Sequence, residues 1–318
     1  MSRLLRRASW IALVAIVVVA SLAAIPAAGR TVQLTPVKIA MVPIEHNAQS
    51  MYAKHRGMFR KQRIDAELIL LSAGDQAIPA LLSGNADFVL ASVPQVASLK
   101  SRDAEVRVVA AGALYNPKKA DAVIVAAPGR ALARARDLVG KTLAASGGPN
   151  TPGHLGALEW LEKNGVDDDD VKIVHIGFPQ VVAPLTQGTV DAAVIAEPYL
   201  TLALEQGAKQ FAKHLDAVCS KPCPVGYWLT RDSVDQNLVA RFRNAVQNAA
   251  AWANQDKNDP ISGRILAKYA PIDSETVAKM RRATFGTRLR VSLAKPWLDV
   301  LKKRGLIPAS FMPGDLVK

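Results

Sequence analysis

One helix-to-strand pattern occurs twice in this chain, and it limits the folds that the chain can adopt. Residues 79–90 read Pro-Ala-Leu-Leu-Ser-Gly-Asn-Ala-Asp-Phe-Val-Leu, and residues 184–195 read Pro-Leu-Thr-Gln-Gly-Thr-Val-Asp-Ala-Ala-Val-Ile. Gly84 and Gly188 lie 104 residues apart, as do the two aspartates. Each copy predicts a helix that ends at a left-handed glycine, a turn that carries an aspartate, and a buried strand. The repetition favours two similar lobes with one copy in each.

The rest of the chain alternates short apolar strands with short helices, which is typical of an α/β fold with parallel strands. Strands are expected at 37–42, 66–71, 86–91 and 122–126, and helices at 48–55, 155–163 and 238–254. Everything after Arg231 is expected to be helical. Extended crossovers are expected near 112–119 and near 219–228. We therefore predict two α/β lobes joined by a two-crossover hinge, with lobe 1 discontinuous (30–118 and 228–318) and lobe 2 formed by 119–227.

The first 29 residues have the features of an export signal. Three arginines, Arg3, Arg6 and Arg7, precede an apolar run from Trp10 to Ile25 and then the small residues around Ala28. That run is shorter than the roughly 20 residues of a membrane-spanning helix, so a cleaved signal peptide (1–29) is predicted. An uncleaved amino-terminal anchor is the alternative. Both place the folded part outside the cytoplasm, and we expect a soluble periplasmic protein.

The composition narrows the classes of partner. The chain of 318 residues is half apolar, which is enough for two cores, and its formal net charge is +13. Its basic residues are scattered rather than interleaved with aromatic ones, so nucleic-acid binding is not expected. A positive surface attracts anions instead.

Cys219 and Cys223 are the two cysteines of the chain. In an oxidising compartment a pair this close in sequence is expected to form a disulfide. A metal pair is the competing interpretation, but it needs further ligands, and His214 alone lies near in sequence. We predict the disulfide.

Polar segments follow the predicted strands, and in open α/β sheets ligands bind beyond the carboxyl ends of strands. The candidate ligand contacts are Glu45, His46, Asn47, Asp75, Gln76, Ser92, Gln95, Ser146, Asn150, Thr151 and Glu197. Thr151 is expected to cap the helix that begins at Pro152, and the free N–H groups of that helix end suit a sulfonate, carboxylate or phosphate.

Two of these side chains allow two interpretations each. Glu197 either accepts a hydrogen bond from the ligand or pairs with an arginine across the hinge. His46 is either a ligand contact or an ordinary loop histidine. The histidines His154, His175 and His214 are assigned structural or exposed positions.

Motifs for catalysis or metal binding are missing from the sequence. It contains no Gly-x-Ser-x-Gly, no Walker loop and no zinc-ligand spacing. Asp167 to Asp170 lack the spaced ligands and glycine of a calcium loop. We therefore expect no catalytic residues, no cofactor and no metal.

Five further segments occur in a characteristic order: Phe59 with Lys61, 64–68, 82–87, 137–141 with 149–152, and 190–198. Together they resemble the nitrate, sulfonate, taurine and thiamine-precursor group of ABC-transporter substrate-binding proteins, over about residues 36–230. The resemblance implies a type II periplasmic-binding-protein fold, hinge closure on a ligand, and delivery to a membrane permease and its ATPase. It places contacts in the loops near Ile44, Gly74 and Ser92, at Asn150–Thr151, and at Glu197. Arg63 stands where this group usually has glycine, so that turn is expected to differ.

The function expected from these features is that of a periplasmic, monomeric solute-binding component of an ABC importer. Its ligand is expected to be a small anionic organic molecule, such as a sulfonate, a carboxylate or a heterocyclic acid. An enzyme of cofactor-precursor biosynthesis on the same fold is one alternative, although the cysteine cluster of the related pyrimidine-synthesising enzymes is absent. A ligand-sensing module for a receptor is the other alternative.

Overall fold

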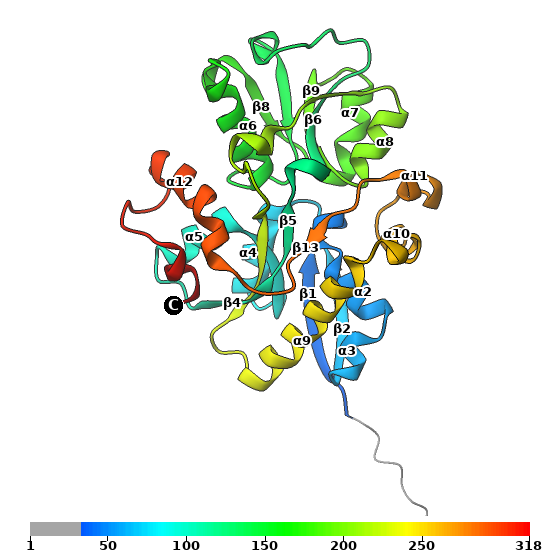
Figure 1. The fold of residues 1–318 in the computed structure, drawn as a ribbon, viewed down its shortest axis with the longest axis vertical. Helices are drawn as coiled ribbons and strands as arrows, with labels where there is room; N and C mark the ends of the chain where they lie inside the picture. The colour runs from blue at the N-terminus through cyan, green and yellow to red at the C-terminus, as the bar shows by residue number, and fades with distance from the viewer. Residues whose placement is uncertain (1–32) are drawn as a thin grey trace, which may run out of the picture. The chain divides into compact units, whose positions relative to one another are not determined.

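The computed structural model describes residues 33–318 (Figure 1). The predicted signal peptide at 1–29 lies outside the described residues. Within 33–318, no helix combines the length and the apolar character needed to cross a bilayer.

The first of two five-stranded sheets has the strand order β2-β1-β3-β12-β4. Its strands are β1 (Thr35–Met41), β2 (Ile64–Leu70), β3 (Phe88–Ser92), β4 (Val106–Ala111) and β12 (Gly226–Arg231). β1 runs parallel to both β2 and β3, as predicted, whereas β12 is antiparallel to β3 and β4. The sheet is therefore mixed, because a strand from late in the chain enters it from the opposite end.

The second sheet has the order β10-β6-β9-β7-β8. Its strands are β6 (Ala122–Ala126), β7 (Thr142–Ala145), β8 (Lys172–His175), β9 (Ala192–Ala196) and β10 (Lys209–Ala212). β7 is parallel to β8 and β9, while β6 is antiparallel to its neighbours β9 and β10. Each sheet thus has a parallel core with antiparallel additions.

A small three-stranded sheet joins the crossovers between the larger sheets (Figure 1). It consists of β11 (Cys223–Pro224), β5 (Ala113–Tyr115) and β13 (Thr284–Phe285). The two predicted crossovers therefore pair with each other through β5 and β11. The expectation that everything after Arg231 is helical is wrong at β13, where the chain extends to hydrogen-bond the free edge of β5.

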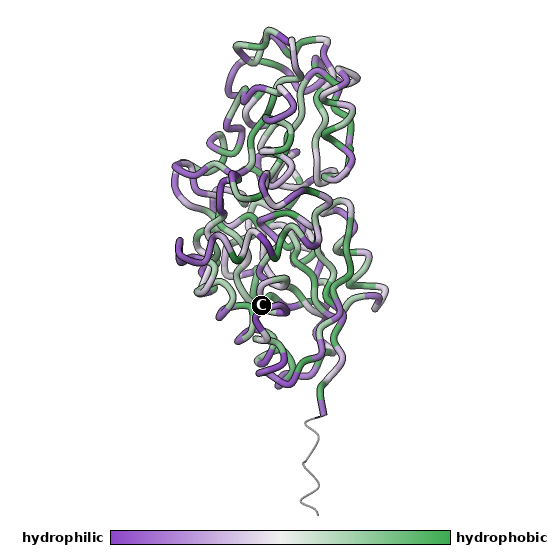
Figure 2. The backbone as a smooth tube through the Cα atoms, turned by 90° about the vertical axis from the view of Figure 1, so that its right-hand side faces the viewer, coloured by the Kyte–Doolittle hydropathy of each residue, from purple (hydrophilic) through white to green (hydrophobic). Residues whose placement is uncertain are grey.

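Helices cover the sheets. They are α2 (Gln49–His55), α3 (Met58–Lys61), α4 (Ala77–Leu82), α5 (Val93–Lys100), α6 (Pro152–Lys163), α7 (Val182–Thr186), α8 (Tyr199–Glu205), α9 (Gln236–Ala253), α10 (Asp259–Leu266), α11 (Ser274–Lys279) and α12 (Lys295–Lys303). α9 packs on the first sheet through Phe242, which stacks on Phe88 with ring centroids 3.8 Å apart. β6 and β9 are buried along their whole length, whereas hydrophilic segments are frequent at the outer edge of the molecule (Figure 2).

The repeated pattern is a repeated structure. α4 ends before Gly84 (φ 78°) and β3, and α7 ends before Gly188 (φ 73°) and β9. In both copies the shared aspartate accepts a hydrogen bond from a backbone N–H of the neighbouring strand region: Asp87 from Lys38 and Asp191 from Thr142, both at 2.9 Å. The aspartate thus belongs to the repeated helix-glycine-strand unit, because its carboxylate hydrogen-bonds the start of each buried strand to the neighbouring strand.

Arg63 keeps a glycine-like backbone at the position where the family resemblance led us to expect a different turn. Its φ is 55°, in the left-handed region, and its carbonyl accepts from the N–H of Thr35 at the start of β1.

One buried apolar cluster includes residues of both large sheets. Because the cluster does not end at residues 118/119 or 227/228, the proposed lobe boundaries at these positions stay a prediction.

Candidate functional site

A cavity lies where strands of both large sheets end. It is lined by residues after β1 (Val42, Ile44), at the end of β3 (Ala91, Ser92), after β7 (Ser146) and at the end of β9 (Ile195, Ala196). The space open to the centre of a water-sized sphere is about 100 Å³. The cavity is therefore large enough to hold a small molecule.

Six of the eleven predicted contacts line this cavity: His46, Asn47, Ser92, Gln95, Ser146 and Thr151. The other five do not line it: Glu45, Asp75, Gln76, Asn150 and Glu197. The strand-end rule thus nominated loops that border the cavity, but it did not separate the side chains that line the cavity from those that do not. Their role as ligand contacts stays a prediction.

The segment Ser146–Thr151 turns sharply between β7 and α6. Gly147 (φ 98°) and Gly148 (φ 89°) adopt conformations that other residues rarely take. Thr151 stands at the N-cap position, but the expected cap is wrong, because its hydroxyl donates to the carbonyl of Gly148 (2.7 Å) instead of accepting from α6. The hydroxyl of Ser146 is buried and has no hydrogen-bond partner among the described residues.

Ser92 and Gln95 hold each other in place at the start of α5. The Ser92 hydroxyl donates to Gln95 Oε1 (2.8 Å), and the Ser92 oxygen accepts from the Gln95 N–H. Gln95 Nε2 then donates to the carbonyl of Gly74 (3.0 Å). These two side chains shape the cavity wall, with most of their hydrogen-bonding groups already used.

Two loops of different sheets meet beside the cavity. The Asp75 N–H donates to the Gly147 carbonyl (3.1 Å), and the Phe178 N–H donates to the Ser72 carbonyl (3.1 Å). A Cβ atom on Gly148 would lie 2.4 Å from Asp75 Cγ, so glycine is needed for this approach. Gln76 stabilises the same loop, because its Oε1 accepts from the Ser72 N–H (3.0 Å). Asp75 and Gln76 therefore act at the rim.

His46 lines the cavity and is paired with a carboxylate. Its Nε2 lies 2.8 Å from Asp121 Oδ2, and both side chains are buried. Burial acts to lower the pKa of His46, but the carboxylates of Asp121 and Glu45 outweigh it and raise the pKa above its usual value. His46 therefore favours the imidazolium, held against the carboxylate of Asp121.

The carboxylates of Glu45 and Glu197 both have hydrogen-bond partners within the chain. Glu45 accepts from the Tyr52 hydroxyl (2.9 Å) and lies 3.1 Å from Arg282, and burial raises its pKa. Glu197 accepts from Thr201 through Oε2 and from the backbone N–H of Arg281 through Oε1 (3.1 Å). Burial raises the pKa of Glu197 to about 7. The interpretation that pairs Glu197 with an arginine side chain does not hold as stated, because Glu197 accepts from the backbone N–H of Arg281. The interpretation of Glu197 as a ligand contact stays a prediction.

Sequence reasoning missed His214 and Phe178, both of which line the cavity. His214 is fully buried, and neither ring nitrogen has a partner among residues 33–318. Burial lowers its pKa to about 3. Nothing in the local pattern marked it, since it follows the edge strand β10 rather than a parallel strand of the sheet.

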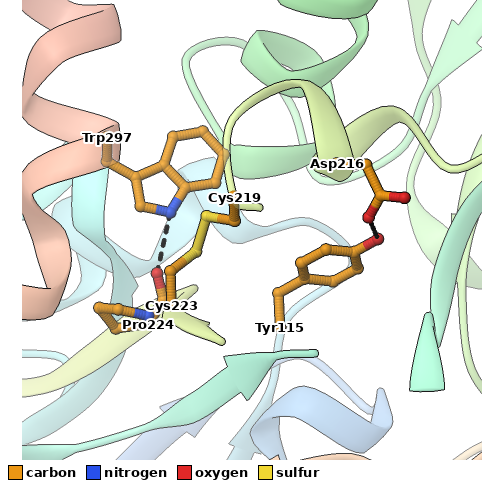
Figure 3. Close-up of a disulfide and its surroundings, with 6 residues drawn as sticks. All are labelled: Tyr115, Asp216, Cys219, Cys223, Pro224 and Trp297. Carbon is orange, nitrogen blue, oxygen red and sulfur yellow. Dashed lines mark hydrogen bonds between the residues drawn. A yellow bond between two sulfur atoms is a disulfide. The ribbon is translucent and has the colours of Figure 1, made fainter. Parts of the chain in front are cut away.

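The predicted disulfide is present and lies next to this segment (Figure 3). Cys219 and Cys223 bracket the turn between the 3-10 helix His214–Ala217 and β11. The Trp297 indole N–H donates to the Pro224 carbonyl (2.9 Å), and the Tyr115 hydroxyl donates to Asp216 (2.6 Å). These contacts fix the chain between His214 and Gly226, both of which line the cavity.

Metal-ligating side chains do not gather anywhere in the described part of the chain: no group of three or more His, Cys, Asp or Glu residues is close enough to hold an ion. The cavity lining likewise has no Lys or Arg. The residues that line the cavity offer hydrogen-bonding groups and apolar surface.

The chain is similar in sequence to a curated protein and in fold to several solved structures. An ABC transporter periplasmic binding protein from Brachyspira hyodysenteriae is 29% identical over 188 residues, which are 55% of this chain and 53% of that protein. The chain thus spans about half the length of the curated relative it matches.

Solved structures match over most of the chain. The alkanesulfonate-binding protein SsuA of Xanthomonas axonopodis pv. citri, bound to MOPS, aligns with a TM-score of 0.71 and 20% identity, covering 89% of this chain and 98% of that one. The periplasmic nitrate-binding protein NrtA of Synechocystis PCC 6803 aligns with a TM-score of 0.69 and 16% identity, covering 87% and 83%. These likenesses confirm the predicted periplasmic-binding-protein fold. The sequence profile of the NMT1/THI5-like family matches residues 45–259, more than half of the chain. The chain belongs to the NMT1/THI5-like family.

Proposed function

We propose that this protein is the periplasmic binding component of an ABC importer and captures one small organic acid in the cavity between its two sheets. The observation that carries the proposal is a cavity walled by strand ends of both sheets and bordered by loops that hydrogen-bond across it. Such a cavity can trap a solute and release it when the loops part. The resemblance to binding proteins of importers supports the same role.

An acid group is supported by three features of the cavity lining. The Ser146 hydroxyl has no partner among residues 33–318, the amino-terminal end of α6 supplies a positive dipole end, and nearby carboxylates raise the pKa of His46. Without Lys or Arg in the lining, a small inorganic anion would gain little there. An acid with an apolar body suits the lining better, because Ile44, Leu90 and Phe178 contribute apolar walls.

The partners that follow from this role are a membrane permease and its ATPase. We propose hinge closure between lobe 1 (30–118 and 228–318) and lobe 2 (119–227), with the crossovers β5 and β11 as the hinge. The protein is proposed to act as a monomer in the periplasm after removal of residues 1–29.

Thermal unfolding of the purified mature protein in the presence of single-ring and short-chain acids tests the proposal. A ligand at 100 times its Kd stabilises the folded state by about 2.7 kcal/mol, which raises the melting temperature by several degrees. Ser146→Ala is expected to reduce the shift, and Ser83→Ala, an exposed serine outside the cavity, is the control.

Three outcomes would contradict the proposal. Stabilisation by neutral or cationic compounds alone would exclude acid capture. Chemical conversion of a bound acid would indicate an enzyme. A ligand that binds but is imported normally by cells lacking this protein would favour the sensor role.

A further inference from the structure

We propose that His214 is a specificity-determining contact and that the ligand is a ring acid which carries, besides its acid group, an uncharged hydrogen-bonding group that His214 recognises. This inference rests on the proposed function, because it assigns the ligand class of the same cavity. Heteroaromatic acids and hydroxylated ring acids belong to this class.

The first observation is that His214 is buried and unpartnered. The residue has no exposed surface, it lines the cavity, and neither Nδ1 nor Nε2 has a hydrogen-bond partner within the described residues. A buried polar group without a partner is unfavourable, and an apolar side chain of similar size would avoid that penalty. A histidine at this place is therefore explained by a partner that arrives with the ligand.

The second observation is that its surroundings hold the ring against α6. A Cβ atom on Gly156 would lie 3.0 Å from His214 Cδ2 and 2.7 Å from Leu215 Cδ2. Only glycine on this helix face allows the two side chains to approach so closely. The disulfide between Cys219 and Cys223 then closes the next turn of the chain. His214 is thus rigidly supported, as a residue that recognises a specific group must be.

The third observation is the difference between the two histidines of the cavity. His46 lies against Asp121, and the carboxylates of Asp121 and Glu45 raise its pKa. His214 has no charged partner, and burial lowers its pKa to about 3, so it is neutral at ordinary pH. A neutral imidazole has one N–H donor and one acceptor nitrogen, and an acid group can satisfy only the donor. A second group on the ligand, uncharged and able to donate or accept, complements His214.

Calorimetric titration with matched probes tests the inference. The probes are benzoate, the three pyridinecarboxylates and the three hydroxybenzoates, which share a ring and an acid and differ in the second group. At least one of these six pyridinecarboxylates and hydroxybenzoates is expected to bind the wild type about 10- to 100-fold more tightly than benzoate. This is the range of affinity expected for one well-placed buried hydrogen bond.

Three variants make the result specific to His214. His214→Leu is expected to bring that isomer to within about 3-fold of benzoate, and its melting temperature without ligand is expected to be equal or higher. His214→Asn keeps a donor and an acceptor and is expected to retain part of the preference. His55→Leu, an exposed histidine away from the cavity, is expected to retain all of it.

The opposite outcomes separate this inference from the proposed function. If benzoate binds as tightly as every isomer, or if His214→Leu keeps the preference, the inference is wrong while acid capture stands. A lower melting temperature in His214→Leu with an unchanged preference would assign the histidine a structural role only. If no acid binds, the proposed function fails and the inference fails with it.

Discussion

Replacing Glu197 with glutamine removes one ionisable carboxyl from the interior and leaves the shape of the side chain. Glu197 is 1% exposed, and its two oxygens accept from Thr201 and from the Arg281 N–H. Burial raises its pKa from an ordinary value of 4.5 to about 7. The carboxyl is therefore more easily kept neutral in the folded protein than in the unfolded chain.

The sign of the pH effect follows from proton uptake. Between pH 4.5 and 7 the folded state binds more protons than the unfolded state, so the free energy of unfolding falls as pH rises through that window and levels off above it. A pKa difference of 2.5 corresponds to about 3 kcal/mol. Glutamine has no such dependence. The variant is therefore expected to equal the wild type or fall about 1 kcal/mol below it at pH 5, since an amide replaces one acceptor, and to exceed it by about 2 kcal/mol at pH 8.

Urea unfolding at pH 5, 6, 7 and 8 measures this difference. His46 and Glu45 also titrate with raised pKa values, so the comparison uses the difference between wild type and variant at each pH. Glu67→Gln, at an exposed position of β2, controls for the loss of one negative charge. Parallel stability curves for the wild type and Glu197→Gln would refute the reasoning.

Two further changes address the cavity. Gly148→Ala is expected to weaken acid binding at least about 10-fold, measured by calorimetry, because the added Cβ would collide with Asp75. Gly165→Ala is the control, since Gly165 also has a positive φ but nothing lies within 4 Å of its added Cβ. This control is expected to lower stability by about 1 kcal/mol and to leave the affinity unchanged. Equal losses of affinity in both would show that backbone strain, not the loop contact, is responsible. Phe178→Leu is expected to weaken benzoate binding about 3- to 10-fold, measured against Phe211→Leu outside the cavity, and an unchanged affinity would place the ring of the ligand elsewhere.

Local periodicity was sufficient to predict the two copies of the repeat and the strand at 122–126. The helix-glycine-strand units around Gly84 and Gly188 follow from buried apolar runs and from the glycines that end the helices, and the strand at 122–126 follows from its buried apolar run. The short strand β13 could not be predicted in this way, because its extended form depends on the free edge of β5 far away in sequence. Arg63 illustrates the same limit, since it takes a left-handed conformation where residue preference alone favours glycine.

The candidate site was predictable only to the level of loops. Polar residues after parallel strands were all treated as equal, and position along the chain does not say how many partners each one finds. Thr151 donates to Gly148, and Glu197 accepts from the backbone of Arg281. His214 lies outside every nominated loop, and the chain brings it to the cavity through β10, an edge strand antiparallel to β6.

The number of hydrogen-bond or ion-pair partners of each buried polar side chain therefore distinguishes two roles near the cavity. Glu45, Asp121 and Glu197 each pair with a residue 75 or more positions away in sequence, and these charges or hydrogen bonds join segments of the two sheets and the carboxy-terminal region. Ser146 and His214 are equally buried, but their polar side-chain atoms have no partner among residues 33–318. A folded protein that leaves two such groups unpaired in one cavity loses stability there, and natural proteins accept such losses mainly at functional sites. The unpaired groups, rather than the three carboxylates, are where the ligand's polar atoms are expected to bind.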